Sequence, residues 1–188
     1  SAALGVACAR AVAEAQGRRL DDATLLDVAL RWERVFHGNP SGVDHTLAAL
    51  GGVGVFTKAE GLRRVRLRAP LRLCIGDTGE RGSTKEMVGA VASALARRPE
   101  ATEKTFDAIA ALVRNATLAL ESGDHRALGD LMNLNQILLA SLMVSTERIE
   151  SLCRAARDAA GPRVSIVMAV YNGAEHVERA VRSLLGQT

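Results

Sequence analysis

Apolar residues recur every three to four positions along most of the chain, which is the spacing of one buried face of an α-helix. Residues 2–16 show the pattern first. Asp21 or Asp22 can cap a second helix that runs to about Phe36, and Pro40 prevents its continuation. The same pattern predicts further helices over residues 41–50, 84–96, 102–121, 125–142, 146–160 and 174–185.

Short apolar runs bounded by turn residues predict the strands. They cover residues 53–57, 62–67, 71–75 and 164–170, with a turn at 59–61 between the first two. The sequence therefore predicts an α+β fold. Pro70 and, more sharply, Gly161-Pro162 suggest boundaries between segments 1–68, 69–161 and 162–188.

Composition narrows the class of protein. Hydrophobic residues make up 48% of the chain but aromatic residues only 3%, so we expect a core of Ala, Leu and Val. The net charge is +3, and the basic clusters carry no interleaved aromatic residues, which argues against a nucleic-acid partner. No apolar run reaches the roughly 18 residues that span a membrane, and we see no signal peptide. Three widely spaced cysteines without metal-ligand spacing predict a reduced, cytoplasmic protein with buried thiols.

The stretch WERVFHGNPSGVD, residues 32–44, holds the candidate chemistry. Glu33 precedes the end of one expected helix, and Asp44 lies in the first turn of the next. The connection is short and stiff, so we expect the two helix ends to lie close together. Neighbouring carboxylates repel unless a metal ion or a proton lies between them. The alternative is structural: Ser41 and Asp44 form a capping box, and Glu33 lies on the surface.

With a glutamate four residues before its histidine and a Gly-Gly strand after it, HGNPSGVD resembles the mevalonate kinases of the GHMP kinase superfamily, which includes galactokinase and homoserine kinase. The first residues, SAALG, match the tail of that family's phosphate-binding loop. GDTGERGSTKEMV (76–88) and the helical stretch 132–161 resemble its second lobe. The resemblance covers about residues 1–161. It implies a partial two-lobe fold, with a remnant of a ribosomal S5 domain 2-like N-terminal lobe and a helix-rich C-terminal lobe.

The resemblance implies ATP-dependent phosphorylation of mevalonate, or a similar small hydroxyl acceptor, with Mg²⁺ in isoprenoid biosynthesis. A homodimer is a further expectation. The implied roles are nucleotide binding by Ser1 and Ala2, Mg²⁺ binding by Ser1 and Glu33, catalysis by Asp44, and acceptor binding by His37, Ser41, Thr84 and Lys85.

The sequence departs from the family pattern in three places. The family's lysine next to the catalytic aspartate, the glycines of its phosphate loop and its Gly-rich third motif are not found. We therefore expect impaired activity, and an inactive fragment or chimera that serves only in binding is an alternative.

Residues 162–188, PRVSIVMAVYNGAEHVERAVRSLLGQT, resemble the opening strand, turn and helix of family 2 glycosyltransferases. Either this tail is a fusion or a misread frame, or its strand and helix replace those that end the kinase lobe. A glycosyltransferase fusion would need donor-binding aspartates that the sequence does not contain.

Overall fold

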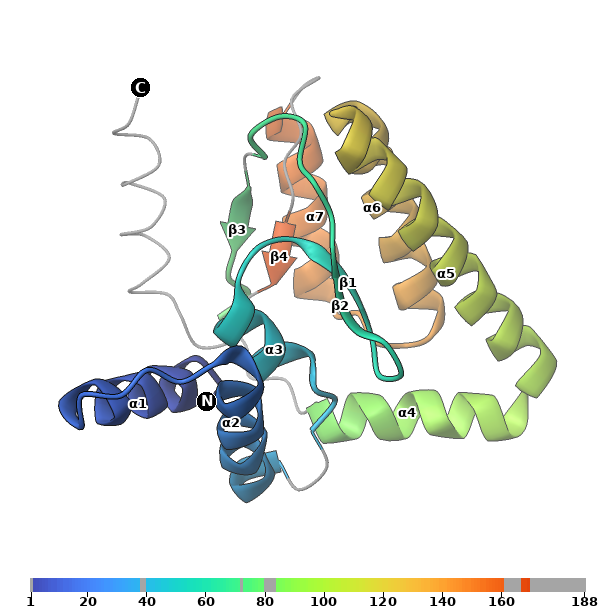
Figure 1. Cartoon of the computed structure of the whole chain (residues 1–188). Helices are drawn as coiled ribbons and strands as arrows, with labels where there is room; N and C mark the ends of the chain where they lie inside the picture. Colours follow the sequence, from blue (N-terminus) through green and yellow to red (C-terminus); the bar gives the residue numbers. More distant parts are fainter. Residues whose placement is uncertain (1, 38–39, 72, 80–83, 161–166, 170–188) are drawn as a thin grey trace. The chain divides into compact units, whose positions relative to one another are not determined.

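The computed structural model describes residues 2–37, 40–71, 73–79, 84–160 and 167–169. It divides the chain into two compact units, Ser1–Arg66 and Leu67–Thr188 (Figure 1). Helices dominate both units, and the described residues of each unit include one two-stranded sheet. The expected mixture of helices and strands is therefore confirmed.

The first unit contains three helices followed by a β-hairpin. They are α1 (Ala2–Ala15), α2 (Asp22–His37), α3 (Val43–Leu50), β1 (Gly54–Thr57) and β2 (Gly61–Arg64). Asp21 is the cap of α2, because its Oδ1 accepts a hydrogen bond of 2.7 Å from the Thr24 N–H. The hairpin is antiparallel, with Gly54 opposite Arg64 and Thr57 opposite Gly61.

The core of this unit joins α1, α2 and α3 through small and aliphatic side chains. Val6, Leu25, Ala29 and Ala49 form its buried cluster. A Cβ atom placed on Gly5 would lie only 2.6 Å from Cδ1 of Trp32, so glycine allows α1 and α2 to approach closely. The core is built from Ala, Leu and Val, as the composition predicts.

Two arginines bind the C-terminal end of α3. The Arg10 guanidinium, from α1, donates to the Ala49 carbonyl at 2.7 Å. The Arg64 guanidinium, from β2, donates to the Leu50 carbonyl at 2.7 Å. The last carbonyls of a helix lack partners within the helix and carry partial negative charge, so these positive donors stabilise the end of α3.

The second unit contains β3 (Cys74–Gly76), α4 (Thr84–Arg97), α5 (Pro99–Ser122), α6 (His125–Ser141), α7 (Glu147–Ala160) and β4 (Val167–Ala169). The helix α5 begins three residues earlier than predicted, because Pro99 is tolerated in the first helical turn. The buried cluster of this unit consists of Ala119 on α5 and Leu128 on α6. The strand β3 is shorter than the expected 71–75.

The strand expected over 164–170 is observed at Val167–Ala169, where β4 pairs in parallel with β3. It also contacts α7. Such pairing is what replacement of the lobe's own last strand would produce. The helix expected over 174–185 lies outside the described residues, so the boundary at Gly161 and the nature of the tail stay predictions.

A polar cluster joins α6 to α7. The Gln136 amide donates to the Ser145 hydroxyl and to Oε1 of Glu150, both at 2.9 Å, and the Ser145 hydroxyl donates to the same Oε1 at 2.7 Å. These bonds hold the pKa of Glu150 below its ordinary value, with the Gln136 amide as the largest cause. The connection between these two helices also contains Met143, a non-glycine residue with φ of 61°.

The thiols only partly follow the expectation that they are buried. Cys8 is exposed on α1, and Cys153 is half-buried on α7. The prediction was wrong for Cys8 because the apolar residues of α1 that face the core, such as Val6 and Ala13, lie on another side of the helix. Within the described residues, no helix is both long and apolar enough to cross a membrane.

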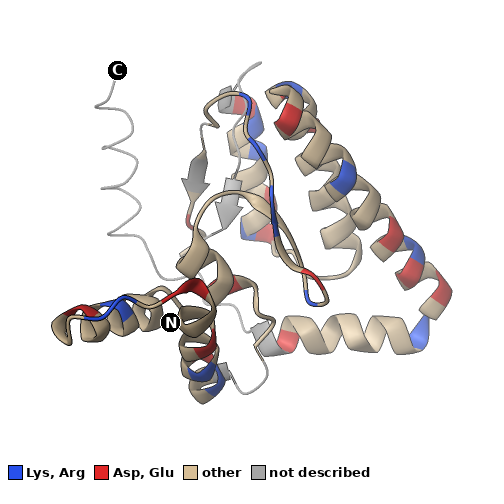
Figure 2. Ribbon diagram, viewed as in Figure 1, with Lys and Arg blue, Asp and Glu red and all other residues tan. Residues whose placement is uncertain are grey.

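Acidic and basic residues both occur along the described helices (Figure 2). The exposed ion pair of Asp27 and Arg31 on α2, at 2.9 Å, is one example of this mixing.

Candidate functional site

Glu33 lies on the buried stripe of α2. Leu25, Ala29 and Glu33 follow one another at intervals of four residues, and their exposed fractions are 2%, 1% and 3%. The alternative that Glu33 is a surface residue is therefore wrong. A buried carboxylate requires a partner or a cation, and Glu33 does take part in an interaction within the structure.

The turn before α3 differs from the predicted capping box. Gly42 is the N-cap, with φ of 100°, and α3 begins at Val43. The Ser41 hydroxyl accepts a hydrogen bond from the Val43 N–H at 3.4 Å, instead of the N–H of residue 44 that a capping box would require. A Cβ atom on Gly42 would lie 3.0 Å from Cζ of Phe56, so packing against β1 helps to fix this turn.

Asp44 is exposed in the first turn of α3. The positive end of the helix dipole favours a carboxylate there. Because no capping box forms, its side chain is not required as the partner of Ser41. Asp44 can therefore face a ligand without breaking a helix cap.

The phosphate-binding position expected from the sequence falls at the N-terminal end of α1. Ala2 is its first residue and is buried. Ser1 lies outside the described residues. The free N–H groups in the first turn of α1 are the kind of donors that bind phosphate at helix N-termini.

Each of the three helices packs against the other two, so the elements that carry Ala2, Glu33 and Asp44 belong to one small bundle (Figure 1). Among the described residues, no group of three or more His, Cys, Asp or Glu side chains is placed to hold a metal ion. The bundle therefore offers carboxylates from two helices instead of a complete protein-made metal cage.

For the remaining expected site residues, the structure describes only the backbone. His37 is the last residue of α2, and Thr84 and Lys85 begin α4 in the second unit. Their side chains lie outside what the structure describes, so their proposed contacts with an acceptor stay predictions.

The sequence patterns did not point to two residues that lie near the site. His45 follows Asp44 and is buried, and Arg10 binds the far end of the same helix. A histidine within an apolar helix gives no distinguishing sequence signal. The contact of Arg10 spans 39 positions, which local patterns do not reveal.

Residues 1–52 match the family described as GHMP kinases N terminal domain. The chain is 35% identical over 176 residues to the mevalonate kinase of Aeropyrum pernix, covering 92% of this chain and 54% of that protein. It is 31% identical over 142 residues to the mevalonate kinase of Arabidopsis thaliana, covering 70% and 37% respectively.

The fold agrees with these matches. The crystal structure of L. major mevalonate kinase in complex with R-mevalonate superposes with a TM-score of 0.76, at 24% identity, over 99% of this chain and 61% of that chain. The predicted resemblance to the mevalonate kinases of the GHMP kinase superfamily is confirmed. The chain spans about half the length of the curated relatives it matches.

Proposed function

We propose that this chain carries part of the catalytic machinery for ATP-dependent phosphorylation of mevalonate, or of a similar small hydroxyl acceptor, in isoprenoid biosynthesis. The main support is Glu33, a carboxylate on the buried stripe of α2, in the same bundle as Asp44 at the start of α3. Phosphoryl transfer depends on positioning and charge neutralisation, and such a bundle can supply both.

The residues fit a role for Mg²⁺. This ion prefers one or two carboxylate or hydroxyl oxygens together with phosphate and water. Glu33 and Ser1 would hold the ion, which neutralises the phosphate charge when bound. The first-turn N–H groups of α1, beginning at Ala2, would bind the phosphates of ATP.

Asp44 would accept the proton of the acceptor hydroxyl, or orient that hydroxyl by its negative charge. Its exposure leaves it accessible to an acceptor. Ser41 and His37 come from the same connection and would orient the acceptor, with Thr84 and Lys85 contacting it from the second unit. We also propose two lobes over residues 1–68 and 69–161, a homodimer and a cytoplasmic location.

The test is transfer of phosphate from ATP to R-mevalonate in the presence of Mg²⁺. It should be run on this chain and on the longest reading frame that contains it. We expect transfer by the longer protein, and loss of about a hundredfold or more in Asp44→Asn with ATP binding largely retained. Asp27→Asn is the matched control, because Asp27 is an exposed carboxylate on α2. Near-normal transfer by Asp44→Asn would overturn the assignment of Asp44.

The departures from the family pattern support a second candidate, a binding module without turnover. Under it, neither protein transfers phosphate, although Mg²⁺ and ATP still raise the unfolding temperature. Transfer by the longer protein alone would locate the missing groups outside this chain. Transfer by neither protein and no stabilisation by ATP would contradict both candidates.

A further inference from the structure

A cavity of about 460 Å³ lies in the second unit, where α4 meets α5. Its charged wall consists of Arg97, the last residue of α4, and Arg98, the N-cap of α5. Its apolar wall includes Ala101, Leu142 and Met143. A concave site of a few hundred Å³, with apolar walls and a few polar groups, is typical of small-molecule binding.

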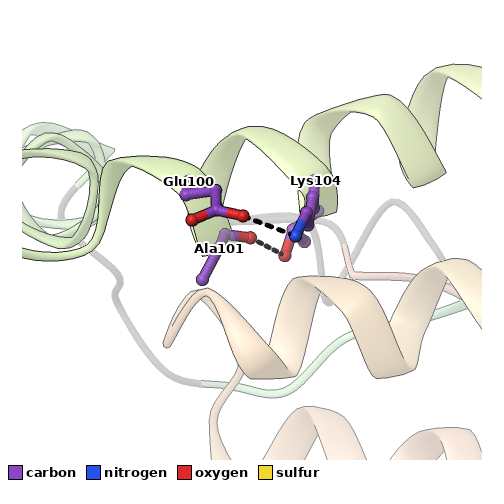
Figure 3. Close-up of polar contacts among 4 residues, drawn as sticks. Glu100, Ala101 and Lys104 are labelled. Atoms are coloured by element: carbon purple, nitrogen blue, oxygen red, sulfur yellow. Dashed lines mark hydrogen bonds and ion pairs between the residues drawn. The ribbon is translucent and has the colours of Figure 1, made fainter.

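The positive charge of this cavity is not neutralised by the residues that line it. Among the described lining residues there is no Asp or Glu. The nearby carboxylate of Glu100 is bound by the Lys104 ammonium at 2.7 Å (Figure 3). Arg97 uses Nε to donate to the Ser93 carbonyl at 3.2 Å, which orients its guanidinium and leaves the terminal nitrogens for another acceptor. Figure 2 shows the basic residues at this junction.

The same wall also offers a hydroxyl group to a ligand. Thr102 is only 5% exposed, and its N–H donates to the Arg98 carbonyl at 3.0 Å. Its hydroxyl has no hydrogen bond in the part of the chain that the structure describes. By contrast, the Thr105 and Ser141 hydroxyls of the same cavity donate to the carbonyls of Ala101 and Leu138. The Thr102 oxygen is not among the described buried polar atoms that lack a partner, so it reaches the space of the cavity, where it can donate to a ligand.

We propose that this cavity binds a small organic anion, with its phosphate or carboxylate on Arg97, Arg98 and the Thr102 hydroxyl and its apolar part against Leu142 and Met143. Guanidinium groups suit such oxyanions because they donate parallel hydrogen bonds. The site is separate from the proposed transfer chemistry, which uses neither arginine. Thr84 and Lys85 begin the 14-residue α4, roughly 20 Å along the helix from Arg97.

The experiment is calorimetric titration of the whole chain with n-butyl phosphate, butyrate and n-butanol as probes. We expect saturable binding of at least one of the two anions and none of the alcohol. The anion that binds more tightly identifies the head group. No saturable binding of either anion at about 10 mM, or equal binding of n-butanol, would overturn the proposal.

Variants assign the binding to these residues. Arg97→Gln combined with Arg98→Gln should weaken binding by at least about tenfold, since two charged hydrogen bonds are lost. Thr102→Val should weaken it by about threefold or more without lowering the unfolding temperature, because valine has a similar volume and removes only the hydroxyl that donates to the anion. Arg114→Gln, at an exposed position on the same helix, is the control and should bind like the wild type.

Two results would show that the site is wrongly placed. In the first, the double arginine variant loses no more affinity than Arg114→Gln. In the second, Thr102→Val retains full affinity at unchanged stability, which would show that the hydroxyl does not bind the anion.

Discussion

Gly5 and Trp32 meet at the crossing of α1 and α2 so closely that a methyl group does not fit between them. A Cβ atom on Gly5 would lie 2.6 Å from both Cδ1 and Cγ of the indole. Trp32 is the single tryptophan of the sequence, so its fluorescence reports on this crossing. Both residues also line an apolar cavity of about 350 Å³ between the two helices.

We predict that Gly5→Ala lowers the free energy of unfolding by about 1–3 kcal/mol, because the added methyl group must displace the indole or separate the helices. Urea unfolding followed by Trp32 fluorescence and by circular dichroism measures the change. Gly89→Ala is the matched control: Gly89 lies within α4 and its added Cβ meets nothing within 4 Å. That variant should gain up to about 1 kcal/mol, since alanine favours the helix. An unchanged Trp32 transition in Gly5→Ala would contradict the close crossing.

The proposed role of Glu33 predicts how Mg²⁺ and ATP affect stability. A ligand that binds only the folded state raises the unfolding temperature, and Trp32 fluorescence can follow it in this chain. We expect Mg²⁺ with ATP to raise the transition of the wild type, and Glu33→Gln to reduce this rise strongly. Asp44→Asn and the control Asp27→Asn should retain it. An equal rise of the unfolding temperature in Glu33→Gln would show that Glu33 does not bind the metal ion.

The Glu150 cluster predicts a dependence of stability on pH. Because the Gln136 amide and the Ser145 hydroxyl lower the pKa of Glu150 from its ordinary value of 4.5, the folded state binds that proton less readily than the unfolded chain. The stabilisation is therefore complete above about pH 4.5 and is lost as the pH falls through the lower pKa of the folded state.

Glu150→Gln should accordingly cost about 1 kcal/mol at neutral pH, and the difference from the wild type should shrink at acidic pH. Denaturant unfolding by circular dichroism, at a series of pH values, measures it. Glu147→Gln, at an exposed position in the first turn of α7, is the control and should show a smaller pH-dependent difference. A difference for Glu150→Gln that stays constant down to about pH 3 would show that the charge is not responsible.

The two described thiols should differ in reactivity. Cys8 is exposed, whereas burial raises the pKa of Cys153 and so lowers its thiolate fraction. With iodoacetamide at about pH 8, we expect Cys8 to be alkylated several times faster than Cys153, as measured by peptide mass spectrometry. Unfolding in urea should abolish the difference. Faster labelling of Cys153 in the folded chain would contradict its burial.

The helices could be predicted largely from the sequence because apolar spacing and caps are local signals. Asp21 caps α2 as expected, and α1 ends at Ala15, one residue before its predicted end. The start of α3 could not be predicted, because it depends on Gly42 packing against Phe56 of the later hairpin. The same limit applies to the contact of Arg10 with Ala49.

For the candidate site, the sequence pointed to Glu33 and Asp44 but not to their surroundings. The burial of Glu33 could have been found, since it continues the four-residue spacing of Leu25 and Ala29. The roles in catalysis and metal binding stay predictions, because they rest on family resemblance and on side chains such as Ser1 that the structure does not describe.

The arginine contacts at the end of α3 limit how far its sequence motif can be transplanted. An eight-residue helix is too short to be stable alone, and the end of α3 is held by Arg10 of α1 and by Arg64 of β2. The position of Asp44 is therefore set by α1 and the hairpin as much as by the motif itself. A designer who grafted WERVFHGNPSGVD onto another scaffold would transfer the sequence of the motif but lose its geometry, unless both guanidinium groups were transferred with it.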